Sequence, residues 1–209
     1  MNYPYPDAVL IIFCKAPVAG QVKTRLTPNL TAGQAAAVHS ELSIKTLQRA
    51  AASHLCPVQL WCSPTTGHDF FSAAKARYPL TLWQQQGADL GERMHHAFCT
   101  ALADYSHALL MGCDCPSLTG HDLESALSAL NQNHDVVLAP AEDGGYVLIG
   151  LNQPRPELFD KMPWGTPCVL AQTRKRIEYL NLCYSELTMQ WDVDTPEDLE
   201  RYRAPCPLA

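Results

Sequence analysis

Several familiar signatures are missing from this sequence of 209 residues. No two of its nine cysteines have the spacing Cys-x-x-Cys, so neither a zinc finger nor a thioredoxin-like motif is supported. GxGxxG and GxxxxGK[ST] are both absent, which removes the Rossmann fingerprint and the Walker A loop. No apolar run approaches the roughly 18 residues of a membrane helix, and no basic segment precedes the first apolar run. We therefore expect a soluble, cytoplasmic protein without membrane insertion.

Positive charge is also scarce. The net charge is -6, with 17% charged and 47% hydrophobic residues. A nucleic-acid partner is therefore not expected, because such proteins present a basic face. The cysteines, including Cys14, Cys56, Cys62, Cys99 and Cys183, lie mostly in apolar surroundings. We expect them to be buried, reduced thiols.

Short apolar runs alternate with longer helical patterns along the chain. Strands are expected at Ala8–Cys14, Pro57–Cys62, Leu80–Gln84, His107–Gly112, Asp135–Pro140 and Tyr146–Leu151. Helices are expected at Thr31–Ser53, Leu90–Tyr105 and Thr119–Asn131, with two more starting at Thr166 and Thr195. The alternation predicts one α/β domain over residues 1–209, with a mostly parallel sheet covered on both faces.

The first expected strand runs into a basic loop with Lys15, Lys23 and Arg25. No acidic residue lies between Asp7 and Glu41 to neutralise it. Two ammonium groups and a guanidinium suit a diphosphate or triphosphate. The alternative is a solvated basic loop, but uncompensated like charges at a strand end favour an anionic ligand.

An aspartate follows the strand HALLM in the segment GCDCPSL. A carboxylate at the carboxyl end of a strand is well placed to hold a divalent cation, so Asp114 is a candidate metal ligand. The alternative is a turn that leads into a helix. Cys113 and Cys115 flank Asp114 and could bind a soft metal, although two thiolates rarely complete a site alone.

Three further segments are expected at the same edge of the sheet. PAEDGGYVLIGL has a hairpin pattern, and whether Asp143 has a role beyond the turn stays open. In WDVDTPEDL, Asp192 and Asp194 are two residues apart and can share a cation or lie exposed to solvent. In QQQGADLGERM, Gly87 and Gly91 bracket a loop that lines a nucleotide pocket or simply connects strand to helix.

Taken in order, KAPVAGQVKTRL, QGADLGERM, GCDCPSL, DGGYVLIGL and WDVDTPEDL resemble the nucleotide-diphospho-sugar transferase superfamily with the GT-A fold. More closely, the sequence resembles bacterial cofC-like glycosyltransferases, relatives of 2-phospho-lactate guanylyltransferase. The resemblance extends from about Leu10 to Tyr202. It implies a three-layer α/β/α Rossmann-like domain that binds a nucleoside triphosphate or nucleotide sugar with Mg²⁺ or Mn²⁺.

The resemblance also implies roles for particular residues. Lys15, Lys23 and Arg25 would contact phosphates in a loop that contains Gly20, and Asp114 would bind the metal. Because Asp-Cys-Pro replaces the Asp-x-Asp of many glycosyltransferases, the second metal carboxylate would be Asp192 or Asp194.

We expect glycosyl transfer from a nucleotide sugar to a small acceptor. Lys23 and Arg25 would stabilise phosphate charge, and Asp143 would position or deprotonate the acceptor. Nucleotidyl transfer from a triphosphate to a phosphorylated small molecule is the alternative, and a non-catalytic nucleotide-binding regulator is a third possibility. The base, the sugar and the acceptor stay open.

Overall fold

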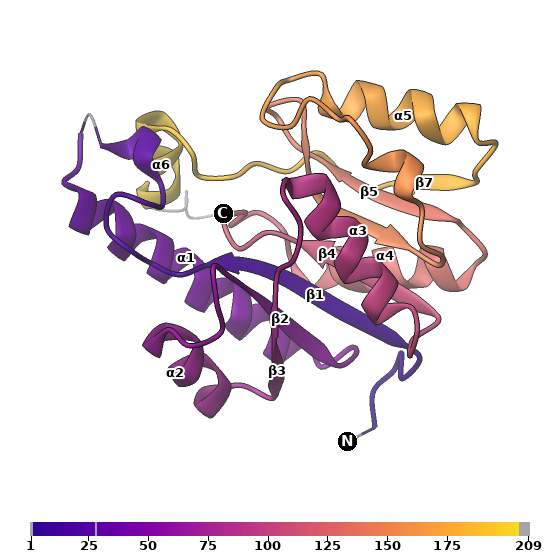
Figure 1. Cartoon of the computed structure of the whole chain (residues 1–209), viewed down its shortest axis with the longest axis horizontal. Coiled ribbons are helices and arrows are strands. Elements are labelled where there is room, and N and C mark those ends of the chain that lie inside the picture. The colour runs from indigo at the N-terminus through magenta and orange to yellow at the C-terminus, as the bar shows by residue number, and fades with distance from the viewer. Residues whose placement is uncertain (1, 28, 205–209) are drawn as a thin grey trace.

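The computed structural model describes residues 2–27 and 29–204, and its strands form one sheet (Figure 1). The strand order in the described residues is β3-β2-β1-β4-β6-β5-β7. The strands are β1 (Ala8–Lys15), β2 (Val58–Ser63), β3 (Leu80–Gln84), β4 (His107–Met111), β5 (Val136–Pro140), β6 (Tyr146–Leu151) and β7 (Tyr184–Glu186). β6 alone runs antiparallel to its neighbours, so the sheet is mostly parallel, as predicted.

Helices cover both faces of this sheet. They are α1 (Ala32–Ser53), α2 (Asp69–Arg77), α3 (Leu90–Ala101), α4 (Gly120–Asn131), α5 (Val169–Tyr179) and α6 (Pro196–Arg203), with 3-10 turns η1 (Thr24–Leu26) and η2 (Pro156–Leu158). Residues of α1, α2 and α4 share one hydrophobic core with the sheet, and residues of α3 and α5 share the other. The expected three-layer α/β/α architecture is thereby confirmed.

The burial of β1 on both faces explains why its sequence is apolar as far as Cys14. Leu10, Ile12 and Cys14 enter the core beneath α1 and α4. Val9, Ile11 and Phe13 enter the core beneath α3. Because successive side chains of a strand point to opposite faces, a strand covered on both sides needs an unbroken apolar run. The first polar side chain, that of Lys15, is exposed where the strand ends.

Helix starts follow local hydrogen-bonding rules in most places. Thr31, Thr119 and Thr195 each cap a helix, and each forms the reciprocal contacts of a capping box with the residue three positions on. The expected helix start at Thr166 is wrong: α5 begins at Val169, and the hydroxyl of Thr166 donates to the carbonyl of Pro163 instead. Neither α2 nor β7 was predicted from the sequence, and α3 ends at Ala101, four residues before the predicted end at Tyr105.

The C-terminal segment returns to the start of the chain. Leu26 of η1, Ala35 and Leu42 of α1, Val193, and Leu199 of α6 form a separate buried cluster. In Figure 1, α6 lies close to η1 and the start of α1. This cluster holds the basic loop against the segment WDVDTPEDL, although Lys23 in the loop and Asp194 in the segment are 171 residues apart in sequence.

The eight cysteines in the described residues are all free thiols. Cys14, Cys56 and Cys62 are buried as expected, but Cys99 and Cys183 are exposed, so the expectation was wrong for those two. No helix in the described part of the chain has the length and apolar character to cross a membrane.

Candidate active site

The basic loop is held in one conformation by its own backbone and by the core. Lys23 caps η1 with a left-handed backbone, φ 48°, and the following turn buries Leu26 completely. Val22, on the other side of Lys23, is also buried. These anchors direct the side chain of Lys23 into the protein, where only 6% of it is exposed.

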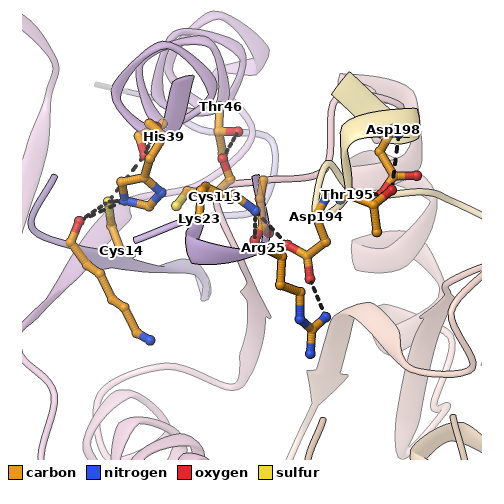
Figure 2. A network of polar contacts seen from close by, with 12 residues as sticks. Cys14, Lys23, Arg25, His39, Thr46, Cys113, Asp194, Thr195 and Asp198 are labelled. Carbon is orange, nitrogen blue, oxygen red and sulfur yellow. Dashed lines mark hydrogen bonds and ion pairs between the residues drawn. The ribbon is translucent and has the colours of Figure 1, made fainter. Parts of the chain in front are cut away.

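Lys23 bridges two carboxylates in this position (Figure 2). Its ammonium nitrogen lies 2.9 Å from Oδ2 of Asp114 and 2.8 Å from Oδ1 of Asp194. Arg25 donates to the other oxygen of Asp194 at 3.2 Å. The expectation that the loop carries no neutralising partner is therefore wrong for Lys23 and Arg25, because their partners arrive from distant segments. Lys15 makes no ion pair within the described residues.

Backbone contacts bring the two carboxylates together. The amide of Val193 donates to the carbonyl of Asp114 at 3.1 Å. Ser117 accepts from the amide of Trp191 and donates to its carbonyl. The loop after β4 and the segment after β7 thus run side by side, which places Asp114 opposite Asp194.

The charges in this cluster shift each other's pKa values. Burial alone would lower the pKa of Lys23, but the carboxylates of Asp114 and Asp194 outweigh burial and raise it. Burial alone would raise the pKa of Asp114, but the ammonium of Lys23 lowers it. Burial, together with the charges of Asp114, Asp194 and Asp143, raises the pKa of Asp192 to about 7.

A large cavity of about 650 Å³ opens beside Lys23. Four positive side chains line it: Lys15 at the end of β1, Lys23 and Arg25 in the loop that follows, and Arg93 on α3. Arg93 is held there by a hydrogen bond from Nε to the carbonyl of Gly87. Gln85 also lines this cavity and belongs to the segment QQQGADLGERM, for which a nucleotide pocket was one expectation, whereas Arg93 was given no definite role and His39 was not predicted. Nothing in the local sequence of His39 signals its position, because α1 brings it in from the side.

A smaller cavity of about 230 Å³ adjoins the first and shares Phe13, Leu90, Gly112 and Asp114 with it. Its walls include Met94, Ile149, Tyr146 and Trp164, and its charged lining residues are Asp114, Asp143 and Asp192. No Lys, Arg or His occurs among the described residues that line it. Asp194 lines the larger cavity and Asp192 the smaller, so the two neighbours in WDVD face different spaces.

Asp143 reaches the smaller cavity from the turn between β5 and β6. Its Oδ1 accepts a hydrogen bond of 2.8 Å from the amide of Gly145. Gly144 has φ 88°, and a side chain there would collide with the carbonyl of Pro167. The glycines therefore serve the hairpin and its close packing, while the carboxylate of Asp143 faces the cavity.

The three glycines expected at a nucleotide site occupy other positions. Gly20, Gly87 and Gly91 are not among the described residues that line either cavity. Gly91 is buried, and a Cβ atom there would lie 2.7 Å from the carbonyl oxygen of Phe159 and 2.9 Å from Nε1 of Trp164. Gly91 therefore allows the segment with Trp164 to pack on α3.

The donor set at Lys23 suits a hard divalent cation. Asp114 and Asp194 offer carboxylate oxygens, the ligands that Mg²⁺ and Mn²⁺ prefer. The ammonium of Lys23, within 2.9 Å of both, marks a position where positive charge is stabilised. Burial, together with the charges of Asp114, Asp194 and Asp143, raises the pKa of Asp192, and a cation nearby would offset the part that these charges contribute. The residues present therefore fit such an ion.

Comparison with known proteins bears on the fold and the family. A family described as "Uncharacterized protein conserved in bacteria (DUF2064)" matches residues 46–166. A structure from Desulfovibrio desulfuricans G20, described provisionally as a nucleotide-diphospho-sugar transferase, is 32% identical with a TM-score of 0.85. The match covers 95% of this chain and 87% of that one. No curated protein matches.

Two more distant structures share the fold alone. The 4-diphosphocytidyl-2C-methyl-D-erythritol synthase of Anaerococcus prevotii DSM 20548 is 10% identical with a TM-score of 0.59, covering 93% of this chain and 95% of that one. Glucosyl-3-phosphoglycerate synthase of Mycobacterium tuberculosis, solved with Mn²⁺, UDP and its product, is 9% identical with a TM-score of 0.54, covering 93% and 74%. From the family match and the 32% identical structure, the chain belongs to the bacterial DUF2064 family and has the fold of nucleotide-diphospho-sugar transferases and nucleotidyltransferases.

Proposed function

We propose that the protein is a metal-dependent glycosyltransferase that moves a sugar from a nucleotide diphospho-sugar to a hydroxyl group of a small, uncharged acceptor. The larger cavity would receive the nucleotide, with Lys15, Lys23, Arg25 and Arg93 near its phosphates. The smaller cavity would receive the acceptor next to the sugar. The two spaces share Asp114, so donor and acceptor would meet beside the metal ligand.

The distribution of charge between the cavities carries this proposal. Cationic side chains line the larger cavity, whereas carboxylates are the charged groups of the smaller one. A phosphorylated acceptor would have to enter a space lined by Asp114, Asp143 and Asp192, of which only Asp114 pairs with a cation among the described residues, that of Lys23. Inside a protein site, two like charges a few ångströms apart repel each other by roughly several kcal/mol. An uncharged hydroxyl compound meets no such barrier.

In the proposed transfer, one bond to the anomeric carbon forms while another breaks. The hydroxyl oxygen of the acceptor forms a bond with the anomeric carbon of the sugar. The bond from that carbon to the phosphate oxygen breaks, and its electron pair leaves with the nucleoside diphosphate. The proton of the hydroxyl passes to a carboxylate of the smaller cavity, for which Asp143 is our candidate. Lys23 and Arg25 stabilise the departing phosphates, and Mg²⁺ or Mn²⁺ on Asp114 and Asp194 would supply further positive charge.

Nucleotidyl transfer is the second candidate. The positive side chains of the larger cavity suit a triphosphate as well as a diphospho-sugar. A distant relative by fold is a 4-diphosphocytidyl-2C-methyl-D-erythritol synthase. In that reaction class a phosphate of the acceptor attacks the α-phosphorus and pyrophosphate leaves. The acidic lining of the smaller cavity disfavours a phosphorylated acceptor and places this candidate second.

The two reactions release different products, which gives a direct test. The protein is incubated with Mn²⁺ and a panel of UDP- and GDP-sugars, with uncharged sugars, polyols and alcohols as acceptors, and nucleoside diphosphate release is measured by chromatography. A parallel panel pairs nucleoside triphosphates with sugar phosphates and measures pyrophosphate. We expect release of one nucleoside diphosphate, faster with an uncharged acceptor.

Two variants make the test specific. Asp114→Asn should abolish release, because it removes the carboxylate charge that would bind the metal and that pairs with Lys23. Asp104→Asn changes an exposed aspartate outside both cavities and should leave release unchanged. Pyrophosphate release with a sugar phosphate would replace our proposal with nucleotidyl transfer. Nucleotide binding without either product would favour a regulator.

A further inference from the structure

A second group of metal-binding side chains lies apart from the carboxylates. The ligand atoms of Cys14, His39 and Cys113 all lie within 4.8 Å of one another. The three residues are 2%, 5% and 5% exposed. Nε2 of His39 lies 4.0 Å from Sγ of Cys14. Figure 2 shows His39 and Cys14 on the left and Cys113 next to Lys23. The proposed glycosyl transfer uses none of them.

The backbone explains why these residues converge. β1 and β4 are parallel neighbours in which Ile12 pairs with Met111. Continuing this register by two residues places Cys14 beside Cys113. Helix α1 brings His39 to the same point, because Leu42 and Leu47 bury the adjoining turns of the helix. The cluster therefore rests on a strand, a strand end and a helix rather than on flexible loops.

The geometry is close to that of a tetrahedral zinc site. Zinc binds thiolates at about 2.3 Å and imidazole nitrogen at about 2.0–2.1 Å, so its ligand atoms lie roughly 3.5–3.8 Å apart. The 4.0 Å separation of His39 and Cys14 needs only a small side-chain adjustment. Two sulfurs and one nitrogen favour zinc, whereas the neighbouring carboxylate oxygens favour Mg²⁺ or Mn²⁺.

We propose that Cys14, His39 and Cys113 form a binding site for a soft divalent cation such as Zn²⁺. All three residues line the larger cavity, so the fourth coordination position would face that space and take a water molecule or a ligand atom. Binding releases two protons, one from each thiol, while the imidazole binds in its neutral form. The resulting group, with one dication and two thiolates, is neutral.

The charge balance near the cluster permits a bound Zn²⁺, and existing hydrogen bonds would be exchanged for coordination. Burial raises the cost of a free thiolate, but a neutral zinc–dithiolate group adds no charge beside Lys23. Nε2 of His39 lies 2.9 Å from the carbonyl of Lys15, and Sγ of Cys14 lies 3.5 Å from the hydroxyl of Ser43. The first of these contacts competes with coordination through Nε2. In the metal-free protein, Sγ of Cys14 also donates to the carbonyl of Lys15 at 3.4 Å, and loss of the thiol proton on metal binding would end that hydrogen bond.

The site would join β1, α1 and the loop after β4 at the floor of the larger cavity. That loop carries Asp114, so the soft cation would stiffen the segment that positions this carboxylate. The inference does not rest on glycosyl transfer, because it follows from the side chains of the cluster alone and can be tested without any nucleotide.

Cobalt gives a direct spectroscopic test. The reduced, metal-free, full-length protein is titrated with Co²⁺, and Zn²⁺ is then added in competition. We expect one equivalent of Co²⁺ to produce a thiolate-to-cobalt charge-transfer band and the strong visible absorption of tetrahedral cobalt, both removed by Zn²⁺. Cys14→Ser and Cys113→Ser should each lose the charge-transfer intensity and bind Zn²⁺ at least about 100-fold more weakly.

Controls separate this site from other thiols and from the carboxylates. Cys62→Ser removes a buried thiol that is not in the cluster, and Asp194→Asn weakens the oxygen site. Both should keep the cobalt spectrum. His39→Gln keeps both thiols and should lose the tetrahedral signature, which provides a second test if a cysteine variant misfolds by circular dichroism. A wild-type spectrum without thiolate charge transfer would overturn the proposal, as would an unchanged spectrum in both cysteine variants or a Cys14–Cys113 disulfide in place of metal binding.

Discussion

The ammonium nitrogen of Lys23 lies 2.9 Å from Oδ2 of Asp114, although 91 residues separate them in sequence. The same ammonium contacts Asp194 at 2.8 Å. A divalent cation on these carboxylates therefore competes with the side chain that would bind the phosphates of the nucleotide. Metal and nucleotide should consequently support each other: the cation releases Lys23 from the carboxylates, and the phosphates give Lys23 a new partner.

Lys23→Met tests this competition. The variant keeps the length of the side chain but leaves Asp114 and Asp194 without their buried counter-charge. We expect it to lose about 1–3 kcal/mol of unfolding free energy in EDTA, less than a fully buried pair because both carboxylates are about one-third exposed. Mn²⁺ alone should then raise its melting temperature more than it raises that of the wild type.

Lys45→Met provides the matched control. Lys45 pairs with Glu41 at 3.0 Å on the exposed face of α1, so the change should stay within about 0.5 kcal/mol and be insensitive to Mn²⁺. A Lys23→Met protein that binds Mn²⁺ no better than the wild type would contradict the competition.

Asp192→Asn should stabilise the metal-free protein at pH 8. Burial and three neighbouring carboxylates raise the pKa of Asp192 to about 7, far above its usual value. A raised carboxyl pKa weakens the fold as the pH rises from about 4 to 7, because the folded state holds the proton more tightly than the unfolded chain. The asparagine removes this penalty, so we expect a gain of about 1–2 kcal/mol at pH 8, after allowing for solvent screening, and a smaller gain at pH 5. Chemical denaturation in EDTA at both pH values measures the gain in unfolding free energy. An equal or larger gain at pH 5 would contradict a raised pKa of Asp192.

Gly91→Ala tests whether that glycine serves packing. The new methyl group would press on the carbonyl of Phe159 and the indole of Trp164, and we expect a loss of about 1–3 kcal/mol with altered tryptophan fluorescence. Gly33→Ala is the matched control on α1, where a Cβ meets nothing within 4 Å. It should be neutral or stabilise by up to about 1 kcal/mol. Similar effects of the two substitutions would show that the contact at Gly91 does not matter.

Asp143→Asn separates turnover from binding. The asparagine oxygen can still accept the hydrogen bond from the amide of Gly145, so the turn should persist. Because the amide cannot accept the proton of the acceptor, transfer should fall by about 10²-fold or more, while the thermal shift with Mn²⁺ and nucleotide is retained. Asp160→Asn, an exposed change near Lys161, is the control. Unchanged turnover in Asp143→Asn would remove Asp143 from the mechanism.

Local signals predicted most of the fold. The apolar run of β1 and the helix starts at Thr119 and Thr195 depend on residues close together in sequence, and each is confirmed. The start of α5 was predicted wrongly from Thr166, because its location depends on a distant contact: the amide of Leu170 donates to the carbonyl of Gly144. Such a contact leaves no mark in the sequence around Thr166.

The candidate site, too, could be predicted from the sequence only in part. The rule that ligands gather at the carboxyl ends of parallel strands correctly brings Lys23, Asp114 and Asp194 together. It does not say that Lys23 is neutralised by those carboxylates, or that Asp192 faces a different cavity from Asp194. These facts depend on side-chain directions and on the buried cluster under α6, which joins segments that are far apart in sequence.

The contact between Lys23 and Asp194 spans 171 residues, so the site cannot assemble in step with synthesis of the chain. A ribosome would have exposed the whole basic loop, and β1 through β7, before Asp194 emerged. Until then Lys23 would have only Asp114 as a partner. The nascent protein would therefore stay unable to hold a cation between two carboxylates until the segment with Asp194 has been made.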